Sequence, residues 1–298
     1  MAFSIGMNLA VQPSVTVGIS FRNPGRYLEL AIKSVFAQTT PNWELLLFDD
    51  GSSDDSLAFT RSLNDQRIKV SSDGKFRGLN VRLNQMVAAA SCPYFARMDA
   101  DDIMHPDRIR LQLQVLAQSD PKTVVGSSAY SIDAESKVVG LKPSSTRQRT
   151  GFAAAHSFHH PTVLASTEWF RMNPYTEEIF FHRCQDAELW CRTSPSTRFV
   201  NLTQPLLFYR EVGTFSFPNY LSTAVGKVIL ARRYGSKSPI SAAWSLTGEL
   251  AKVWLYGVAD STGRADVLVR RRNRPVPSVE AAEAQAVVDS ILRQALPL

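Results

Sequence analysis

Short apolar runs alternate with amphipathic stretches over about the first 120 residues, and this alternation limits the folds open to the chain. The run from Glu44 to Phe48 is apolar after its first residue, as expected for a parallel strand that is covered on both faces. Residues 15–20, 67–71 and 93–96 are typical of further strands, and apolar residues at helical spacing separate them. Strands that alternate with helices predict a mostly parallel, doubly wound α/β sheet.

Local signals indicate where the intervening helices begin. Asn23 and Pro24 are typical of a helix start, with the asparagine as cap and the proline in the first turn. Ser53 is the expected cap of a second helix. A third helix is expected over 79–90, and Pro106 opens a fourth.

The regular alternation ends near Lys122. The sequence from there predicts strands around a turn at 133–136, a short helix over 185–192, and further strands over 199–210. From Asn219 the pattern is helical and basic. We therefore divide the chain into three expected regions, 1–121, 122–218 and 219–298.

Composition and charge exclude several classes of protein. With 298 residues, of which 44% are hydrophobic, the chain is long enough to bury a core. The formal net charge is +6, and residues 219–298 carry 11 Lys and Arg against 6 Asp and Glu. No aromatic and basic recognition motif accompanies this charge, so we expect no nucleic-acid partner. An anionic membrane surface suits a basic C-terminal region at least as well.

The expected location is cytoplasmic. The N-terminus lacks the features of a signal peptide, and no apolar run reaches the ~20 residues of a membrane span. Three cysteines without a C-x-x-C motif suit a reducing compartment and argue against a zinc site.

A candidate interfacial helix lies in the C-terminal region. Its residues are Trp244, Leu250, Val253, Trp254 and Tyr256, flanked by Lys252 and Arg264. It predicts peripheral attachment to the inner face of the cell membrane. Packing of this helix against the rest of the chain is the alternative.

Three carboxylates follow the strand at 93–96. Asp99, Asp101 and Asp102 lie at its carboxyl end, which is where ligands bind in an open α/β sheet. Acids this close repel one another, and a hard divalent cation such as Mg²⁺ or Mn²⁺ is their natural partner. An acidic loop that caps the following helix is the alternative.

Two other strand ends carry polar residues. Ser20 and Asn23 follow the first strand, and Asp49 and Asp50 follow the second. Neighbouring parallel strands would bring them close to Asp99, where a carboxylate can accept hydrogen bonds from a base or a ribose. The alternative is ordinary turn chemistry.

Asp186 is a separate acidic candidate at the start of the helix over 185–192. A carboxylate that faces a cleft can take a proton from an incoming hydroxyl group. Negative charge is also common at helix N-termini for purely structural reasons. His159, His160 and His182 are candidate metal ligands, although a structural role is more common for a histidine.

Taken together, these blocks resemble the family 2 glycosyltransferases of the GT-A fold. The resemblance covers 15–23, 31–38, 44–56, 97–108 and 185–192, in the order and spacing of that family. It implies a Rossmann-like, doubly wound sheet with an acceptor-side extension and a C-terminal helical region. Residues 1–121 would bind the nucleotide sugar, 122–218 would bind the acceptor, and 219–298 would be a basic helical extension.

The resemblance also implies roles for individual residues. Ser20, Asn23, Asp49, Asp50, Asp99 and Ala100 would contact the nucleotide, with Asp50 on a uracil-type base and Asp99 near the ribose. Asp101 would hold a Mn²⁺ or Mg²⁺ ion that bridges the diphosphate, in the family's DXD motif. Asp186 would be the catalytic base. Supporting residues would be Asp102, Arg108, His160, Gln185 and Arg210.

Three positions depart from the family pattern. Gln185 replaces the usual acid before the base, Arg22 stands where tyrosine is common, and Val212 occupies the place of a metal-reaching histidine.

The resemblance predicts an inverting, metal-dependent transferase. Its donor would be a nucleotide diphosphate sugar, with a UDP-sugar expected, and its acceptor a glycan or a lipid-linked oligosaccharide of bacterial surface polysaccharide synthesis. A non-catalytic nucleotide- or glycan-binding protein and a nucleotidyltransferase are the alternatives. The sequence names neither the donor sugar nor the linkage.

Overall fold

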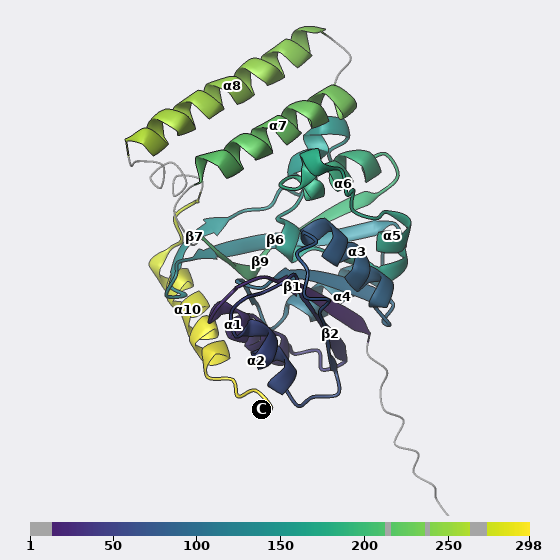
Figure 1. Cartoon of the computed structure of the whole chain (residues 1–298), viewed down its shortest axis with the longest axis vertical. Helices are drawn as coiled ribbons and strands as arrows, with labels where there is room; N and C mark the ends of the chain where they lie inside the picture. Colours follow the sequence, from purple (N-terminus) through teal and green to yellow (C-terminus); the bar gives the residue numbers. More distant parts are fainter. Residues whose placement is uncertain (1–13, 212–215, 236–238, 263–272) are drawn as a thin grey trace, which may run out of the picture.

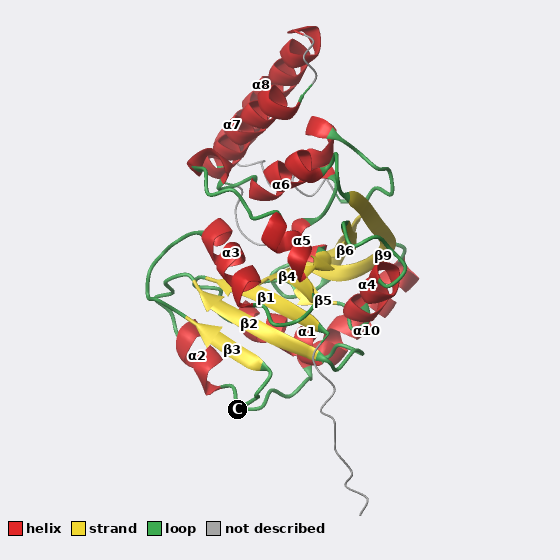
Figure 2. Ribbon diagram, turned by 90° about the vertical axis from the view of Figure 1, so that its right-hand side faces the viewer, coloured by secondary structure: helices red, strands yellow, loops and turns green. Residues whose placement is uncertain are grey.

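The computed structural model describes residues 14–211, 216–235, 239–262 and 273–298. In this part of the chain nine strands form one sheet, in the order β3-β2-β1-β4-β8-β6-β9-β5, with β7 paired to β6 (Figures 1 and 2). The predicted α/β architecture is confirmed.

The first half of the chain builds the parallel part of the sheet. β1 (Val15–Phe21) lies between β2 (Trp43–Asp49) and β4 (Tyr94–Asp99), and β3 (Ile68–Ser71) lies outside β2. All four run in one direction, so their carboxyl ends meet at one edge of the sheet. The predicted strands at 15–20, 44–48, 67–71 and 93–96 are therefore confirmed, with ends that differ by one to three residues.

Helices cover both faces of this parallel part. α1 (Tyr27–Phe36), α2 (Ser56–Ser62) and α4 (Arg108–Leu116) pack on one face, and α3 (Leu79–Ala89), α5 (Thr167–Met172) and α6 (Gln185–Thr193) pack on the other. Successive side chains of β2 alternate between the two cores. Leu45 and Leu47 pack with α1, whereas Leu46 packs with α3. Burial on both faces explains why this strand is continuously apolar.

The rest of the sheet is mixed: β6 and β9 run parallel, and the other pairs are antiparallel. β5 (Ile103–Met104) pairs with β9 (Arg198–Arg210), and β8 (Leu164–Ser166) joins β4 to β6 (Thr123–Ile132). β6 and β7 (Val138–Lys142) form the predicted hairpin around 133–136. Short 3-10 helices, η1 (Gly151–His156), η2 (His160–Thr162) and η3 (Ile179–Phe181), connect these elements.

The C-terminal helices take two different places. α7 (Phe217–Tyr234) and α8 (Pro239–Ser261) lie side by side at one end of the molecule, far from the C-terminus (Figures 1 and 2). α10 (Ser278–Leu292) returns to the sheet and packs on α1 and β7. Among the described helices, each falls short of the length or the hydropathy that a membrane span requires.

Two expected helix starts were wrong: Asn23 does not cap α1, and Asp55, not Ser53, stands at the cap position of α2. Helix α1 begins at Tyr27, and Asn23 adopts a φ of 50° outside it. Its Oδ1 accepts hydrogen bonds from the backbone N–H groups of Ser53 and Asp54, at 2.7 and 3.3 Å. Asparagine tolerates this left-handed conformation well. Asn23 therefore joins the loop after β1 to the loop after β2.

Close packing of α7 on the body depends on Gly226. A Cβ atom at this position would lie 2.2 Å from Cys184 Sγ and 3.0 Å from the carbonyl oxygen of Phe180. We expect Gly226→Ala to displace α7 and to lower the free energy of unfolding by about 1–3 kcal/mol, measured by urea denaturation. Gly248→Ala is the matched control, because a Cβ at Gly248 meets no atom within 4 Å. That change should be neutral or mildly stabilising; equal losses in both variants would contradict the packing argument.

Candidate functional site

One cleft of about 950 Å³ opens at the carboxyl ends of the parallel strands. Asp50 follows β2, Asp99 ends β4, and Asp186 lies in the first turn of α6; all three line this cleft. The far wall includes Ser222 and Thr223 of α7. The fold thus brings together acids that lie up to 136 positions apart in the sequence.

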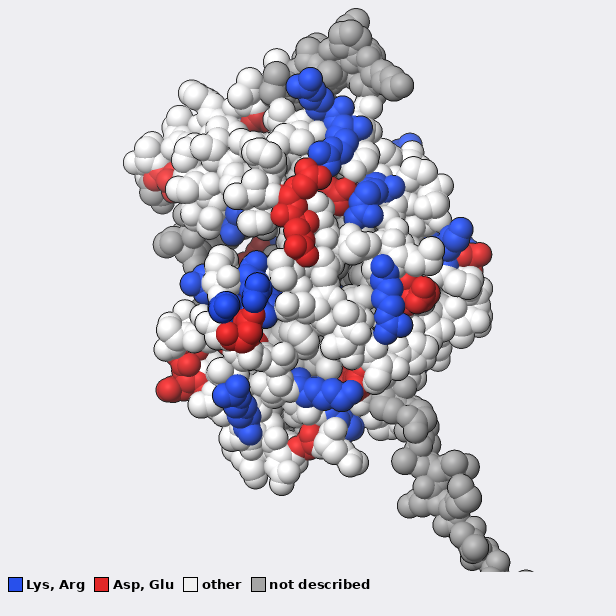
Figure 3. All heavy atoms as spheres, turned by 45° about the vertical axis from the view of Figure 1, so that its right-hand side comes forward, with Lys and Arg blue, Asp and Glu red and all other residues white. Residues whose placement is uncertain are grey.

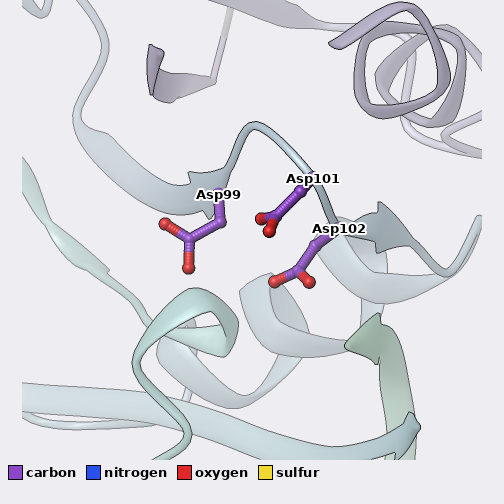
Figure 4. A group of neighbouring side chains, drawn as sticks. All are labelled: Asp99, Asp101 and Asp102. Carbon is purple, nitrogen blue, oxygen red and sulfur yellow. The ribbon is translucent and has the colours of Figure 1, made fainter. Parts of the chain in front are cut away.

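Asp99, Asp101 and Asp102 form a compact cluster at the end of β4 (Figure 4). One carboxylate oxygen from each lies within 4.8 Å of the others. Ser20 is the neighbour of Asp99 in the β1–β4 register. Asp99 is the member of the cluster that lines the cleft, and Ala100, Asp101 and Asp102 lie behind it. Ser20, Asn23 and Asp49 are likewise not among the lining residues.

Burial and mutual repulsion make the ionised forms of the clustered carboxylates costly. Burial, followed by the charge of Asp99, raises the pKa of Asp101 to about 6. Burial and the charges of Asp101 and Asp99 raise the pKa of Asp102 well above its usual range. Asp102 Oδ2 is also buried without a hydrogen-bond partner. A divalent cation would satisfy that atom and favour the ionised carboxylates, so these residues fit a metal site.

Arg210 ties the acidic loop to β9. Its backbone N–H donates to Asp102 Oδ1 at 2.8 Å, and its Nε donates to the carbonyl oxygen of Asp101 at 2.6 Å. The guanidinium group also lies 4.4 Å from the ring centre of Tyr27. Arg108 is completely buried and donates to the carbonyl oxygens of Arg97 and Val163, at 2.9 and 3.3 Å. Arg210 therefore holds the loop and Arg108 supports the backbone of β4, and neither lines the cleft.

Asp50 organises the other side of the cleft. Its Oδ1 accepts from the backbone N–H groups of Arg77 and Gly78, at 2.7 and 3.2 Å, and from Nε of buried Arg82 at 2.9 Å. Oδ2 accepts from the N–H of Gly78 at 3.1 Å and retains capacity for another donor. Asp49 accepts hydrogen bonds from the backbone N–H of Ser52 and the hydroxyl of Ser72. These bonds are the structural role that the sequence offered as the alternative to nucleotide binding.

Asp186 is held by a well-anchored helix. Leu189 and Trp190 are fully buried, which fixes α6 against the core and turns the first-turn residues Gln185 and Asp186 toward the cleft. Burial raises the pKa of Asp186, so its carboxylate is a stronger base than that of an ordinary exposed aspartate. Gln185 Oε1 is buried without a partner.

His160 lines the cleft beside these acids. Its Nε2 lies 2.8 Å from the hydroxyl of buried Tyr175, and burial lowers its pKa well below the usual range. His160 is therefore neutral at physiological pH. His182 lies on the exposed rim, and His159 also contributes to the lining.

Sequence reasoning overlooked Arg82, Arg97 and Tyr175. Arg97 shows a usable signal, because a charged residue inside an apolar strand two positions before an acid lies on the same face as that acid. Arg82 shows a similar one, because it falls on the apolar face of α3. Tyr175 follows no pattern, and only the fold brings it to His160.

Comparisons with known proteins agree on the family and the fold. Residues 16–173 match the model of glycosyl transferase family 2. The chain is 30% identical over 205 residues to the putative glycosyltransferase EpsE of Bacillus subtilis. The aligned region spans 67% of this chain and 73% of that protein. It is 30% identical over 118 residues to the Escherichia coli UDP-Glc:α-D-GlcNAc-diphosphoundecaprenol β-1,3-glucosyltransferase WfgD, spanning 40% of this chain and 46% of that protein.

A solved structure supports the fold. The mannosyltransferase PcManGT of Pyrobaculum calidifontis, in complex with GDP-Man and Mn²⁺, has a TM-score of 0.57 and 17% identity, over 95% of this chain and 87% of its own. At this identity the likeness concerns the fold alone.

Arg82 offers a test of how the base-side wall is held. Because Arg82→Met would leave buried Asp50 without its cation, we expect unfolding to become easier by about 3–5 kcal/mol, measured by urea denaturation. Arg77→Met removes a guanidinium just before the start of α3, but that group pairs with Asp73 at an exposed position. Its loss should be clearly smaller, and a comparable loss would refute the special role of Arg82.

Proposed function

Because this chain belongs to glycosyl transferase family 2, we propose that it transfers a sugar from a nucleotide diphosphate donor to a hydroxyl group of a glycan, with inversion and with a divalent metal. That the protein is a glycosyltransferase follows from the family. The single observation that carries the finer proposal is the shared cleft, which Asp50, Asp99 and Asp186 all line.

The donor would lie across the carboxyl ends of β1, β2 and β4. The free capacity of Asp50 Oδ2 suits the N–H group of a uracil-type base, and Asp99 suits a ribose hydroxyl. Ser20 and Asn23 would shape the loop beneath the nucleotide. Asp101, with the unpartnered Oδ2 of Asp102, would hold Mn²⁺ or Mg²⁺. When bound, such an ion supplies Lewis-acid stabilisation of the leaving diphosphate.

The acceptor hydroxyl would be activated by Asp186. Its carboxylate takes the proton as the hydroxyl oxygen forms a bond to the anomeric carbon. The bond from that carbon to the diphosphate oxygen breaks on the opposite face, so the configuration inverts. The raised pKa of Asp186 suits this general-base role.

Replacing the proposed base tests the mechanism. Asp186→Asn should lower the transfer rate by roughly 100- to 10,000-fold, while UDP and Mn²⁺ still bind, as measured by turnover of labelled UDP-sugars and by calorimetry. In the wild type, activity should fall as the pH drops through the raised pKa of Asp186, because the base is then protonated. Gln185→Glu, which restores the usual acid, should stay active. Undiminished turnover by Asp186→Asn would exclude Asp186 as the base.

A non-catalytic binding protein is favoured by Gln185 alone. The glutamine replaces the family's usual acid, and its Oε1 lacks a partner. Absence of turnover with every nucleotide sugar tested, despite tight nucleotide binding, would support this second candidate.

The structure also suggests how a lipid-linked acceptor is presented. α8 packs on α7 through residues such as Tyr256, whose ring lies 4.4 Å from that of Tyr220. Its outer side exposes large apolar side chains, namely Leu250, Trp254, Leu255 and Val258. Of the residues predicted to face the membrane, Tyr256 therefore packs inside the protein, while Leu250 and Trp254 are exposed. The side chain of Trp244 and residue Arg264 lie outside the described residues.

This outer side is suited to an anionic membrane. The sequence that follows α8, 262–274, contains five arginines and one aspartate. On the face shown in Figure 3, charges of both signs are spread across the body. Basic residues that follow an apolar helix in the sequence favour anionic lipids. Because α7 lines the cleft, attachment of the membrane to α8 would bring a diphosphate-linked lipid acceptor close to Asp186. The protein would then be cytoplasmic and bound peripherally to the membrane.

A surface variant separates membrane binding from catalysis. Replacing Leu250 and Trp254 together by serine should lower binding to vesicles of phosphatidylglycerol by roughly tenfold or more, measured by cosedimentation. Turnover with a soluble acceptor should not change. Val279→Ser, at an equally exposed position on α10, is the control and should bind as the wild type does. Unchanged vesicle binding by the double variant would contradict the assignment.

A further inference from the structure

Arg97 is the most tightly constrained charge in the cleft. It lies on β4 two residues before Asp99, so both side chains point to the same side of the strand. Nη1 donates to Asp99 Oδ2 at 2.8 Å, and Nη2 donates to Oδ1 of the same carboxylate. The Arg97 side chain is 3% exposed, whereas that of Asp99 is 31% exposed. The arginine thus holds its partner from inside the protein and leaves the outer edge of the carboxylate to the cleft.

The charge of the same guanidinium group acts on both acidic parts of the site. Burial raises the pKa values of Asp102 and Asp186, and the positive charge of Arg97 opposes that rise in both. On its other side, burial lowers the pKa of His160, and Arg97 lowers it further. Arg97 Nε is buried without a partner. A positive charge at this place therefore acts on the acid cluster and on the proposed base together.

The acid cluster is balanced before any cation arrives. Three carboxylates, Asp99, Asp101 and Asp102, interact electrostatically with three guanidinium groups, those of Arg97, Arg108 and Arg210. Arg97 donates one hydrogen bond to each carboxylate oxygen of Asp99. A lone divalent cation would consequently find little net negative charge, whereas a cation that arrives with a diphosphate brings its own anionic ligands.

We propose that Arg97 is a positioning residue which neutralises Asp99 and fixes its carboxylate, so that the site takes up the divalent cation together with the donor diphosphate instead of the cation alone. This inference rests on the proposed metal-dependent function. It assigns to Arg97 the coupling between the two ligands. It also explains why the guanidinium group of Arg97 is buried in a strand at the cleft, although its desolvation is costly.

The test measures Mn²⁺ binding in the absence of any nucleotide. Free Mn²⁺ is followed by electron paramagnetic resonance at pH 8, with wild-type protein and with Arg97→Met. Removing the positive charge should tighten binding of Mn²⁺ alone by roughly tenfold. The gain in Mn²⁺ affinity on adding UDP should shrink by a similar factor, and transfer should fall at least tenfold because Asp99 is no longer held. A purely structural role predicts weaker Mn²⁺ binding.

Two further variants keep the result interpretable. Arg171→Met removes an equal charge from the exposed side of α5, away from the cleft, and should leave Mn²⁺ binding unchanged. Arg97→Lys keeps the charge but not the bidentate pair, and should bind Mn²⁺ alone as weakly as the wild type does while transferring sugar more slowly. If Arg97→Met does not fold, Mn²⁺ binding by Arg97→Lys that is clearly tighter than wild type overturns the proposal.

Failure of this inference and failure of the proposed function are distinguishable. Without a metal site, wild-type protein would bind no Mn²⁺ even with UDP present. If wild type binds Mn²⁺ with UDP, but folded Arg97→Met binds Mn²⁺ alone no more tightly than wild type, only the role of Arg97 is excluded.

Discussion

Carboxylates gathered at the ends of buried strands repel one another, and the site depends on how that repulsion is balanced. Parallel pairing of β1, β2 and β4 forces Asp50 and Asp99 to the same edge of the sheet. An arginine then holds each of them, Arg82 for Asp50 and Arg97 for Asp99. Each arginine comes from a buried position on an element that also contributes to the core. The acids are thereby held in place by packing that exists without a ligand, which is how a site becomes preorganised.

The second half of the chain supplies the opposite wall by a different route. α6 begins at the cleft, and its inner side is locked by Leu189 and Trp190. Glu188 of the same helix accepts hydrogen bonds from Arg192 and from the hydroxyl of Tyr234 at the end of α7, at 3.0 and 2.8 Å. This network joins the helix that bears the proposed base to the helix that lines the far wall. Changes in the position of α7 would therefore be transmitted to Asp186.

Sequence reasoning succeeded where neighbouring residues decide the outcome and failed where distant ones do. The strand ends that carry Asp50 and Asp99 could be located, because apolar runs mark buried strands whatever they pack against. Asn23 was misjudged because an asparagine that follows a strand can cap a helix or a loop with equal chemistry. The choice depended on the N–H groups of Ser53 and Asp54, which lie about thirty residues away. Tyr256 could not be separated from Trp254, since the side of α8 that faces α7 is set by the packing of the two helices.

The sequence alone determined the α/β class, the order of the strands along the chain and the acids at their ends. Hydrophobic periodicity and turn residues act over a few neighbouring positions, so these features need no information about distant residues. Tertiary structure decided which charges meet: Arg97 with Asp99, Arg82 with Asp50, and His160 with Tyr175. Tertiary structure also decided that Asp186 faces the cleft rather than solvent. The physical reason is that desolvation and charge pairing depend on the distance in space between groups, and strand register and helix packing set that distance.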